Sequence, residues 1–377
     1  MRTTTQNRKP QPNPPGDLTK ALGSRLVGQP EAVEAVVPFV RMFQARLAPA
    51  GRPVGVFLLL GPTGTGKTRT VECLAEVLHG SEKHFLKVDC GEFQMEHEVA
   101  KLIGAPPGYL GHRETQPMIT QAKLNALTTE HCELSIVLFD EVEKAAPSLA
   151  RLLLGVLDKG TLRLGDNSSV NFERSLIFLT SNLGATEMMR ELEPRFGFEA
   201  VADRAGQSET KGKLGKIGIG AVRRKFSPEF VNRIDRVVSY QPLDAAALEL
   251  ILDQQLANLQ SLITERHGTR AFRLDLGQPA RELLLRHGAS RRYGARELRR
   301  TIQRLLLQPL AVMVSEGKVP PRSTVRIRPS ACGEKLDLTV GPEPPYRAAL
   351  LEFSRQMRKR RVPYELAPFD TDDSDAA

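Results

Sequence analysis

The 377-residue chain contains no tryptophan, and its cysteines (Cys73, Cys90, Cys132 and Cys332) are widely spaced, with no C-x-x-C pair. This spacing speaks against a disulfide framework or a cysteine zinc site and favours a reducing, cytoplasmic environment. There is no run of about 18 apolar residues, so we expect no transmembrane helix and no membrane partner. The N-terminal stretch MRTTTQNRKPQPNPPGD lacks the apolar region of a secretory signal.

Acidic residues are outnumbered: 53 Lys and Arg stand against 44 Asp and Glu, and the net charge is +9. Such an excess indicates either a nucleic-acid partner or arginines on solvated helix faces. Much of the positive charge lies in Arg291–Arg300 and Arg355–Arg361, and neither segment has the interleaved aromatics of a base-stacking platform. We therefore favour solvated helix faces and keep nucleic-acid binding as the alternative.

The composition divides the chain into four segments. Residues 1–16 are rich in Pro, Asn, Gln and Thr, which predicts a disordered tail. We expect an α/β domain over residues 17–240 and a mostly helical domain over residues 241–341. Residues 342–377 form a C-terminal extension. Its acidic end, Pro368–Ala377, is either solvated or folded back on the basic run before it.

Short apolar runs alternate with amphipathic stretches in the first domain. Such runs, joined by helices, predict buried parallel strands in an α/β architecture. The candidate strands are Val56–Leu60, His84–Cys90, Leu134–Asp140 and Ser175–Ser181.

Helical periodicity begins at Pro242 and continues to about Gln308. The later segments STVRIRPS and KLDLTV predict a small hairpin or edge strands. Residues 191–221 lack strong periodicity, which predicts a long loop or a helix–loop insertion.

The segment GPTGTGKT, Gly61–Thr68, follows the apolar run VGVFLLL and precedes a predicted helix. Its glycines let the backbone turn tightly and direct N–H groups at phosphate oxygens, and the helix N-terminus favours the same anion. Lys67 would reach the β- and γ-phosphates, and the Thr68 hydroxyl would ligate Mg²⁺. We therefore predict ATP and Mg²⁺ as cofactors. The loop residues assigned to nucleotide are Gly61, Pro62, Thr63, Gly64, Thr65, Gly66, Lys67 and Thr68.

Polar side chains follow two more predicted strands. Asp140 and Glu141 end the segment LSIVLFDE. Asp140 suits contact with Mg²⁺, and Glu141 suits the base that activates the attacking water. Two adjacent acids here could instead cap a helix. Asn182, after SLIFLTS, could hold the water beside the γ-phosphate, because its strand end converges on the same site.

Six segments occur in this order: GPTGTGKT, GAPPGYLGH, LFDEVEKAAPSLARLLLGVLDKGTL, TSNLGA, FSPEFVNRID and YGAREL. Together they resemble the second ATPase ring of ClpA/ClpB-type AAA+ protein unfoldases, over about Leu18 to Val340. The resemblance implies an AAA+ P-loop domain with a central parallel sheet, followed by a small, mostly helical lid domain with short strands. It also implies a homo-oligomeric ring, in this family a hexamer, that uses ATP hydrolysis to thread unfolded or misfolded polypeptide through its pore.

The resemblance assigns further residues. Val27 and Gly28, in RLVGQPEAV, match the segment that borders the adenine base. Arg233, in FVNRID, matches the arginine finger that reaches the neighbouring subunit's γ-phosphate. Arg296, in YGAR, matches the sensor-2 arginine that contacts the nucleotide of its own subunit. Tyr109, in PPGYLGH, matches the pore-loop aromatic that grips substrate.

The chain departs from the family after the pore tyrosine, where GHRETQPM introduces His112, Arg113 and Pro117. Grip or substrate preference could therefore differ. We recognise one ATPase module and expect neither a coiled-coil middle domain nor a folded N-terminal domain before it, so we do not expect co-chaperone-dependent disaggregation. The tails could recruit substrate or an adaptor, and the C-terminal extension could equally pack on the lid domain.

Protease-coupled relatives carry an exposed aliphatic-Gly-hydrophobic tripeptide before the arginine-finger segment. Phe196–Phe198 and Ile217–Ile219 lie in that interval, but glycine between apolar residues is common. We therefore do not favour a ClpP-like peptidase partner, although the sequence does not exclude one. Two other functions stay open: a nucleic-acid remodelling ATPase such as a helicase loader, and a regulatory ATPase dedicated to one partner.

Overall fold

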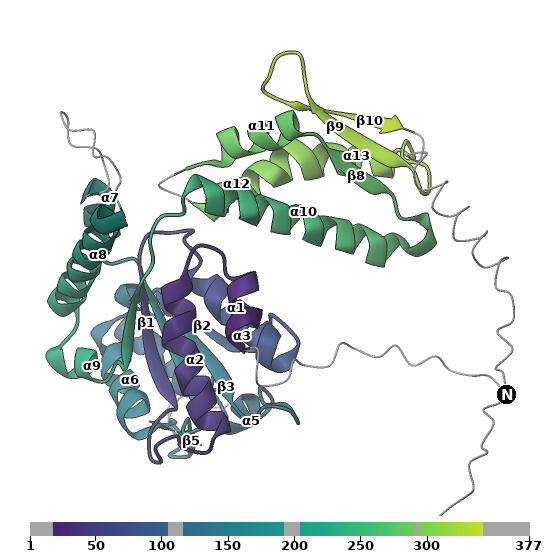
Figure 1. Ribbon diagram of the computed structural model, residues 1–377. Helices are drawn as coiled ribbons and strands as arrows, with labels where there is room; N and C mark the ends of the chain where they lie inside the picture. Colours follow the sequence, from purple (N-terminus) through teal and green to yellow (C-terminus); the bar gives the residue numbers. More distant parts are fainter. Residues whose placement is uncertain (1–17, 105–115, 192–203, 291–293, 342–377) are drawn as a thin grey trace, which may run out of the picture. The chain divides into compact units, whose positions relative to one another are not determined.

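The computed structural model describes residues 18–104, 116–191, 204–290 and 294–341 (Figure 1). These residues form two compact units. The first runs to Gln254 and includes Leu285–Ile302; the second comprises Gln255–Leu284 and the described residues from Gln303 onward.

A five-stranded parallel sheet forms the centre of the first unit, in the order β2-β3-β6-β1-β7. Four strands confirm the sequence prediction, whereas β7 was missed because it is short and begins with a charged residue. Strands β1, β3 and β6 are buried almost throughout, as expected of a parallel sheet covered on both faces. The strands are β1 (Gly55–Leu60), β2 (Leu86–Asp89), β3 (Ser135–Asp140), β6 (Ser175–Ser181) and β7 (Arg236–Ser239).

Two apolar cores lie on the two faces of this sheet, because successive side chains of a strand point to opposite sides. Phe57 and Leu59 of β1 belong to the core beneath α1 (Leu18–Arg25), α2 (Pro30–Gln44) and α3 (Lys67–His79) (Figure 1). The neighbouring β1 residues Val56, Leu58 and Leu60 belong to the opposite core, which includes buried side chains of α6 (Pro147–Lys159), α8 (Arg204–Lys225) and α9 (Pro228–Asn232).

Helix α8 occupies most of the region for which a long loop or a helix–loop insertion was predicted. A Cβ atom at Gly218 would lie 2.6 Å from Met188 Cε and 3.2 Å from Leu60 Cδ1, so the glycine lets α8 approach the sheet closely. The tripeptide Ile217–Ile219 is therefore part of a packed helix rather than of a loop. The other candidate, Phe196–Phe198, lies outside the described residues.

Shorter elements complete the first unit. They are η2 (Cys90–Glu92), η3 (Glu96–Glu98), α4 (Val99–Ile103), α5 (Gln121–Asn125), η4 (Val142–Lys144), the antiparallel pair β4 (Thr161–Arg163) and β5 (Ser169–Asn171), and α7 (Ala185–Glu191). Helix α12 (Ala295–Ile302) also belongs to this unit.

The second unit combines helices with a three-stranded sheet in the order β10-β9-β8. The pair β9–β10 is antiparallel, as the predicted hairpin required, whereas β8 runs parallel to β9. Strand β8 lies within residues 242–308, where the sequence pattern had predicted helix but no strand. The elements are α10 (Ala245–His267), within which the unit boundary falls, η5 (Gly268–Arg270), β8 (Arg273–Leu276), α11 (Gln278–Gly288), the π-helical η6 (Gln303–Leu307), α13 (Gln308–Ser315), β9 (Thr324–Pro329) and β10 (Leu336–Gly341).

No helix in the described part of the chain is both long and apolar enough to cross a membrane.

Candidate functional site

The loop Gly61–Thr68 connects the end of β1 to the first turn of α3. Gly61, Gly64 and Gly66 have φ angles of +144°, +78° and +105°, in the region that favours glycine. A Cβ at Gly61 would lie 2.5 Å from the Tyr240 carbonyl oxygen, so a side chain does not fit there. The loop thus brings its backbone to the N-terminus of a 13-residue helix, an arrangement that suits anion binding.

Lys67 is 9% exposed, and its Nζ donates to three neutral oxygens. The acceptors are Gly61 O at 2.6 Å, Pro62 O at 2.9 Å and Asn182 Oδ1 at 2.8 Å. Burial lowers the pKa of Lys67 to about 8, although Glu143, the strongest of three nearby acids, opposes this shift. A phosphate would supply the negative charge that this buried amine lacks as a direct partner, so the loop fits a nucleotide.

Thr180 on β6 fixes the two acids at the end of β3. Its hydroxyl donates to Asp140 Oδ1 and accepts the Glu141 backbone N–H at 2.9 Å. Asp140 also forms an ion pair with Lys87 Nζ on β2 at 2.7 Å. Glu141 has a left-handed backbone, with φ of +56°, which is uncommon for a residue other than glycine.

Asn182 joins the acids to the phosphate loop. Its Oδ1 accepts from Lys67, and its Nδ2 donates to Glu141 Oε1 at 3.1 Å. Its backbone N–H donates to Glu143 Oε1 at 2.9 Å. The other Glu143 oxygen is buried and has no hydrogen-bond partner among the residues that the structure describes. The ends of β1, β3 and β6 therefore meet in one hydrogen-bonded group.

The side-chain atoms near the phosphate loop that could ligate a metal are oxygens. Thr68, in the first turn of α3, and Asp140 are both half-buried. Within the described ranges no cluster of three or more His, Cys, Asp or Glu has the geometry to hold a metal alone. An ion held here would need ligands beyond the protein. This fits Mg²⁺, which takes one or two protein oxygens together with phosphates and water.

A cavity of about 630 Å³ adjoins the phosphate loop and is lined by Val27 and Gly28, with residues of α1, α2 and the first part of α10. This volume is ordinary for a small-molecule pocket. The buried Gln29 was not predicted. Its Nε2 donates to Thr65 O at 3.1 Å and Gln241 O at 3.0 Å, and so ties the cavity wall to the phosphate loop.

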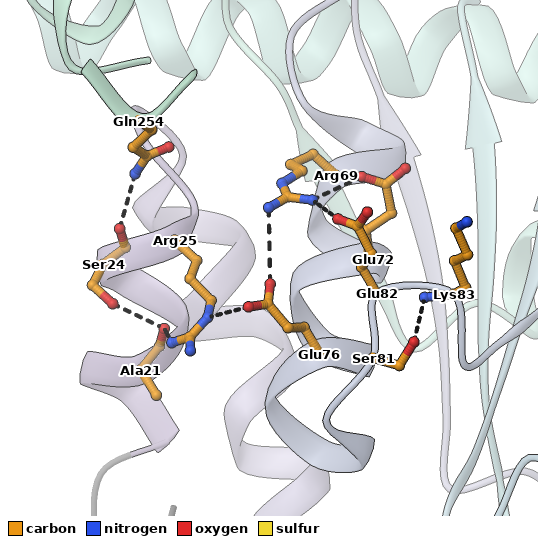
Figure 2. A network of polar contacts seen from close by, with 10 residues as sticks. All are labelled: Ala21, Ser24, Arg25, Arg69, Glu72, Glu76, Ser81, Glu82, Lys83 and Gln254. Carbon is orange, nitrogen blue, oxygen red and sulfur yellow. Dashed lines mark hydrogen bonds and ion pairs between the residues drawn. The ribbon is translucent and has the colours of Figure 1, made fainter. Parts of the chain in front are cut away.

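A polar network holds α3 behind this loop, as Figure 2 shows. Arg25 of α1 bonds Glu76 at 3.2 Å, and Arg69, which follows Thr68, pairs with Glu76 and two further acids. Gln254 of α10 donates to Ser24 O at 3.0 Å. Each of these partly exposed pairs contributes little alone, and the network connects α1 with α3, the helix that begins at Lys67.

The arginines assigned by resemblance lie in different surroundings. Arg296 is exposed in the first turn of α12, and its positive charge contributes to the lowered pKa of Lys67. Its neighbour Ala295 donates its N–H to Gly64 O at 3.0 Å, which anchors this segment on the phosphate loop. Arg233, by contrast, forms an ion pair with Asp158 at the end of α6. Tyr109 lies outside the described residues.

Family models match two consecutive segments of the chain. Residues 52–237 match the AAA domain of the Cdc48 subfamily, and residues 243–327 match the C-terminal D2-small domain of ClpB. Together they cover more than two thirds of the 377 residues.

Curated relatives carry the same family name. The chain is 38% identical over 345 residues to the chaperone protein ClpB of Rhodopseudomonas palustris, covering 92% of this chain and 36% of that protein. It is 37% identical over 302 residues to ClpB of Meiothermus ruber, covering 80% and 33%. The chain thus spans about a third of the length of the curated relatives it matches.

Solved structures of Hsp104 share the fold. One is a closed state with ATPγS and FITC casein (TM-score 0.69, 31% identity), and another is the extended Saccharomyces cerevisiae Hsp104:casein complex (TM-score 0.69, 30% identity). Each match covers 85% of this chain and 51% of the other. The chain therefore belongs to the AAA+ ATPases, as a nucleotide-binding module of the ClpB C-terminal type.

Proposed function

We propose that this chain hydrolyses ATP and uses the energy to pull unfolded polypeptide through a ring of identical subunits. The observation that carries the ATPase part is the hydrogen-bonded group of Lys67, Asn182 and Glu141 at the carboxyl ends of β1, β6 and β3. The polypeptide part rests on the likeness to proteins named ClpB chaperones and to Hsp104 bound to casein.

ATP would lie with its phosphates along Gly61–Thr68, its base near Val27 and Gly28, and Lys67 on the β- and γ-phosphates. To reach them, Lys67 exchanges the Gly61 and Pro62 carbonyls for phosphate oxygens. Thr68 and Asp140 would hold Mg²⁺, which when bound neutralises phosphate charge.

Glu141 is the group proposed to accept the proton of the attacking water, and Asn182 is proposed to orient that water. The bond between Asn182 Nδ2 and Glu141 Oε1 supports this pairing, because one amide then touches both the base and Lys67. Arg296, anchored beside the loop, would stabilise charge on the transferred phosphoryl group from within the same chain.

Arg233 is proposed to act on the nucleotide of a neighbouring subunit. Its ion pair with Asp158 gives the arginine a defined place at the end of α6 rather than on the phosphate loop of its own chain. An isolated chain would then hydrolyse ATP slowly, and a closed ring, in this family a hexamer, would be the active form. The domain boundaries at residues 16, 240 and 341 remain proposals, as does recruitment of adaptors through the tails. A cytoplasmic location is supported by the cysteines, all four of which are unpaired.

The first experiment compares ATPase rates with no addition, with unfolded casein and with plasmid DNA. We expect casein to stimulate hydrolysis. Tyr109→Ala should keep basal ATPase activity but lose the stimulation and the unfolding of a tagged fluorescent protein. Leu47→Ala, which removes an exposed apolar side chain elsewhere, serves as the control.

Stimulation by DNA alone, with a steep salt dependence, would replace the proposal with nucleic-acid remodelling. Tight binding to one protein without processing of casein would indicate a partner-specific regulatory ATPase. Retained unfolding by the Tyr109→Ala variant would show that this tyrosine is not the grip.

A further inference from the structure

Two lysines to which the sequence analysis assigned no role bind the two acids at the end of β3. Lys87 pairs with Asp140, and Lys144 Nζ donates to Glu141 Oε2. Lys144 closes the short helix η4 (Val142–Lys144), and its backbone N–H also donates to the Glu141 carbonyl at 3.0 Å. Lys144 therefore contacts Glu141 twice, through the backbone and through the side chain.

Both carboxylate oxygens of Glu141 are engaged in this arrangement. Oε1 accepts from Asn182 and Oε2 from Lys144. The carboxylate is thus held between an amide and an ammonium group, and its direction is set by both. A carboxylate that serves as a base needs a lone pair directed at water, so at least one of these bonds must open or turn before proton transfer.

The Glu141 backbone points to the same restraint. Its left-handed conformation is disfavoured for a residue with a Cβ and persists where neighbours fix it. The Thr180 hydroxyl accepts its N–H, and Lys144 binds its carbonyl and its carboxylate.

The Lys144 side chain is 49% exposed, so its bond to Glu141 can open without disturbing the buried group. The bond also raises the pKa of Lys144, which keeps the ammonium group charged. By contrast, the bond from Asn182 belongs to the half-buried chain that continues to Lys67. Lys144 is therefore the partner of Glu141 that can be released most readily.

We propose that Lys144 is a positioning residue that restrains Glu141 and thereby keeps basal ATP hydrolysis low. This inference rests on the proposed function, because it assigns a restraint to the base of that reaction. Hydrolysis proceeds from the state in which the bond between Lys144 and Glu141 is open.

The test measures kcat and KM for ATP in the full chain without added substrate protein. Lys144→Met, which keeps side-chain length but removes charge, should raise kcat about two- to fivefold and leave KM unchanged, as expected for the loss of an exposed ion pair. Lys144→Arg should keep the wild-type rate. Lys318→Met is the matched control, since this exposed lysine pairs with Glu316 at 2.6 Å in the second unit.

A double-mutant cycle shows whether the effect passes through Glu141. In a Glu141→Gln background, Lys144→Met should leave the residual rate unchanged. An increase there would overturn the inference, as would an unchanged or lower kcat for Lys144→Met alone. A wild-type chain without ATPase activity would overturn the proposed function and the inference together, so the two failures are distinguishable.

Discussion

The two ends of the central sheet both carry polar groups, but the groups differ in kind. At the carboxyl end, β1, β3 and β6 lead into the phosphate loop, the acids and Asn182, which are hydrogen-bonded to one another. At the amino end, a cavity of about 500 Å³ lies at the starts of β3 and β6. Its buried pair, Ser135 and Ser175, is neutral, with hydroxyl oxygens 2.7 Å apart.

The charges at the amino end are solvated. Glu133 and Arg174 form an ion pair at 2.7 Å, with side chains 69% and 70% exposed. At the carboxyl end, Lys67 is buried, held by neutral oxygens, and has its pKa lowered to about 8. A polar cavity alone therefore does not indicate a nucleotide-binding site. A buried charge that would gain from an incoming anion is the better indicator.

The largest expected effect is that of Lys67→Met. Because it removes the one buried cation of the phosphate loop, ATP affinity should fall about 100-fold or more. Arg174→Met at the opposite end removes a solvated cation and should leave affinity unchanged. Calorimetric titration with ATP measures both. Equal losses in the two variants would break the contrast between the ends.

Asn182→Ala should lower kcat about 10- to 100-fold, with a smaller change in ATP affinity, because Lys67 and Glu141 lose the amide between them. Asn171 at the amino end is the matched control. Its Oδ1 accepts a local N–H, from Glu173, so Asn171→Ala should retain full activity. Steady-state kinetics of both variants measure kcat and KM. An unchanged kcat in the Asn182→Ala variant would show that the Asn182 amide has no role in the proposed mechanism.

The phosphate loop and most of the central strands could be predicted because each is encoded in a few adjacent residues. The eight residues from Gly61 to Thr68 include the glycines that the loop conformation requires, and the buried strands are visible as apolar runs in the sequence. Lys87, Thr180 and Lys144 could not be assigned in this way. Their contacts depend on strand register, such as Asp89 opposite Asp140, and on the left-handed turn at Glu141.

Of the strands that were not predicted, β7 and β8 were missed for a related reason. β7 and β8 have four residues each, and each pairs with a strand distant in sequence. Local patterns cannot reveal such pairing. Arg233 could be found only through family resemblance, since an isolated arginine carries no local signal of its role.

The lowered pKa of Lys67 predicts a pH dependence of ATP binding. Phosphate favours the charged amine of Lys67 and raises its pKa. Above about pH 8 this amine is mostly neutral in the absence of ATP, so ATP binding takes up a proton. The affinity for ATP should then weaken by up to about tenfold per pH unit between about pH 8 and pH 10. Below that range Lys67 should cause no change in affinity. Calorimetry in buffers of different ionisation enthalpy counts the protons. If ATP binding took up no proton at alkaline pH, the lowered pKa of the buried Lys67 would be contradicted.

The smallest expected effect belongs to the amino end. Arg174→Ala should lower the free energy of unfolding by no more than about 1 kcal/mol, because its ion pair with Glu133 is solvated. ATPase activity should not change. Urea denaturation measures the free energy of unfolding. A loss of several kcal/mol, or a loss of ATPase activity, would show that the ion pair at this end of the sheet contributes to stability or function.

We propose Glu141 as the base of an ATPase whose site lies at the carboxyl end of the sheet. The most direct test measures ATP affinity and turnover together in Glu141→Gln. We predict affinity close to that of the wild-type chain and a turnover lower by about 100-fold or more, because the amide keeps the shape of the carboxylate but accepts no proton. Wild-type turnover in this variant would contradict the account.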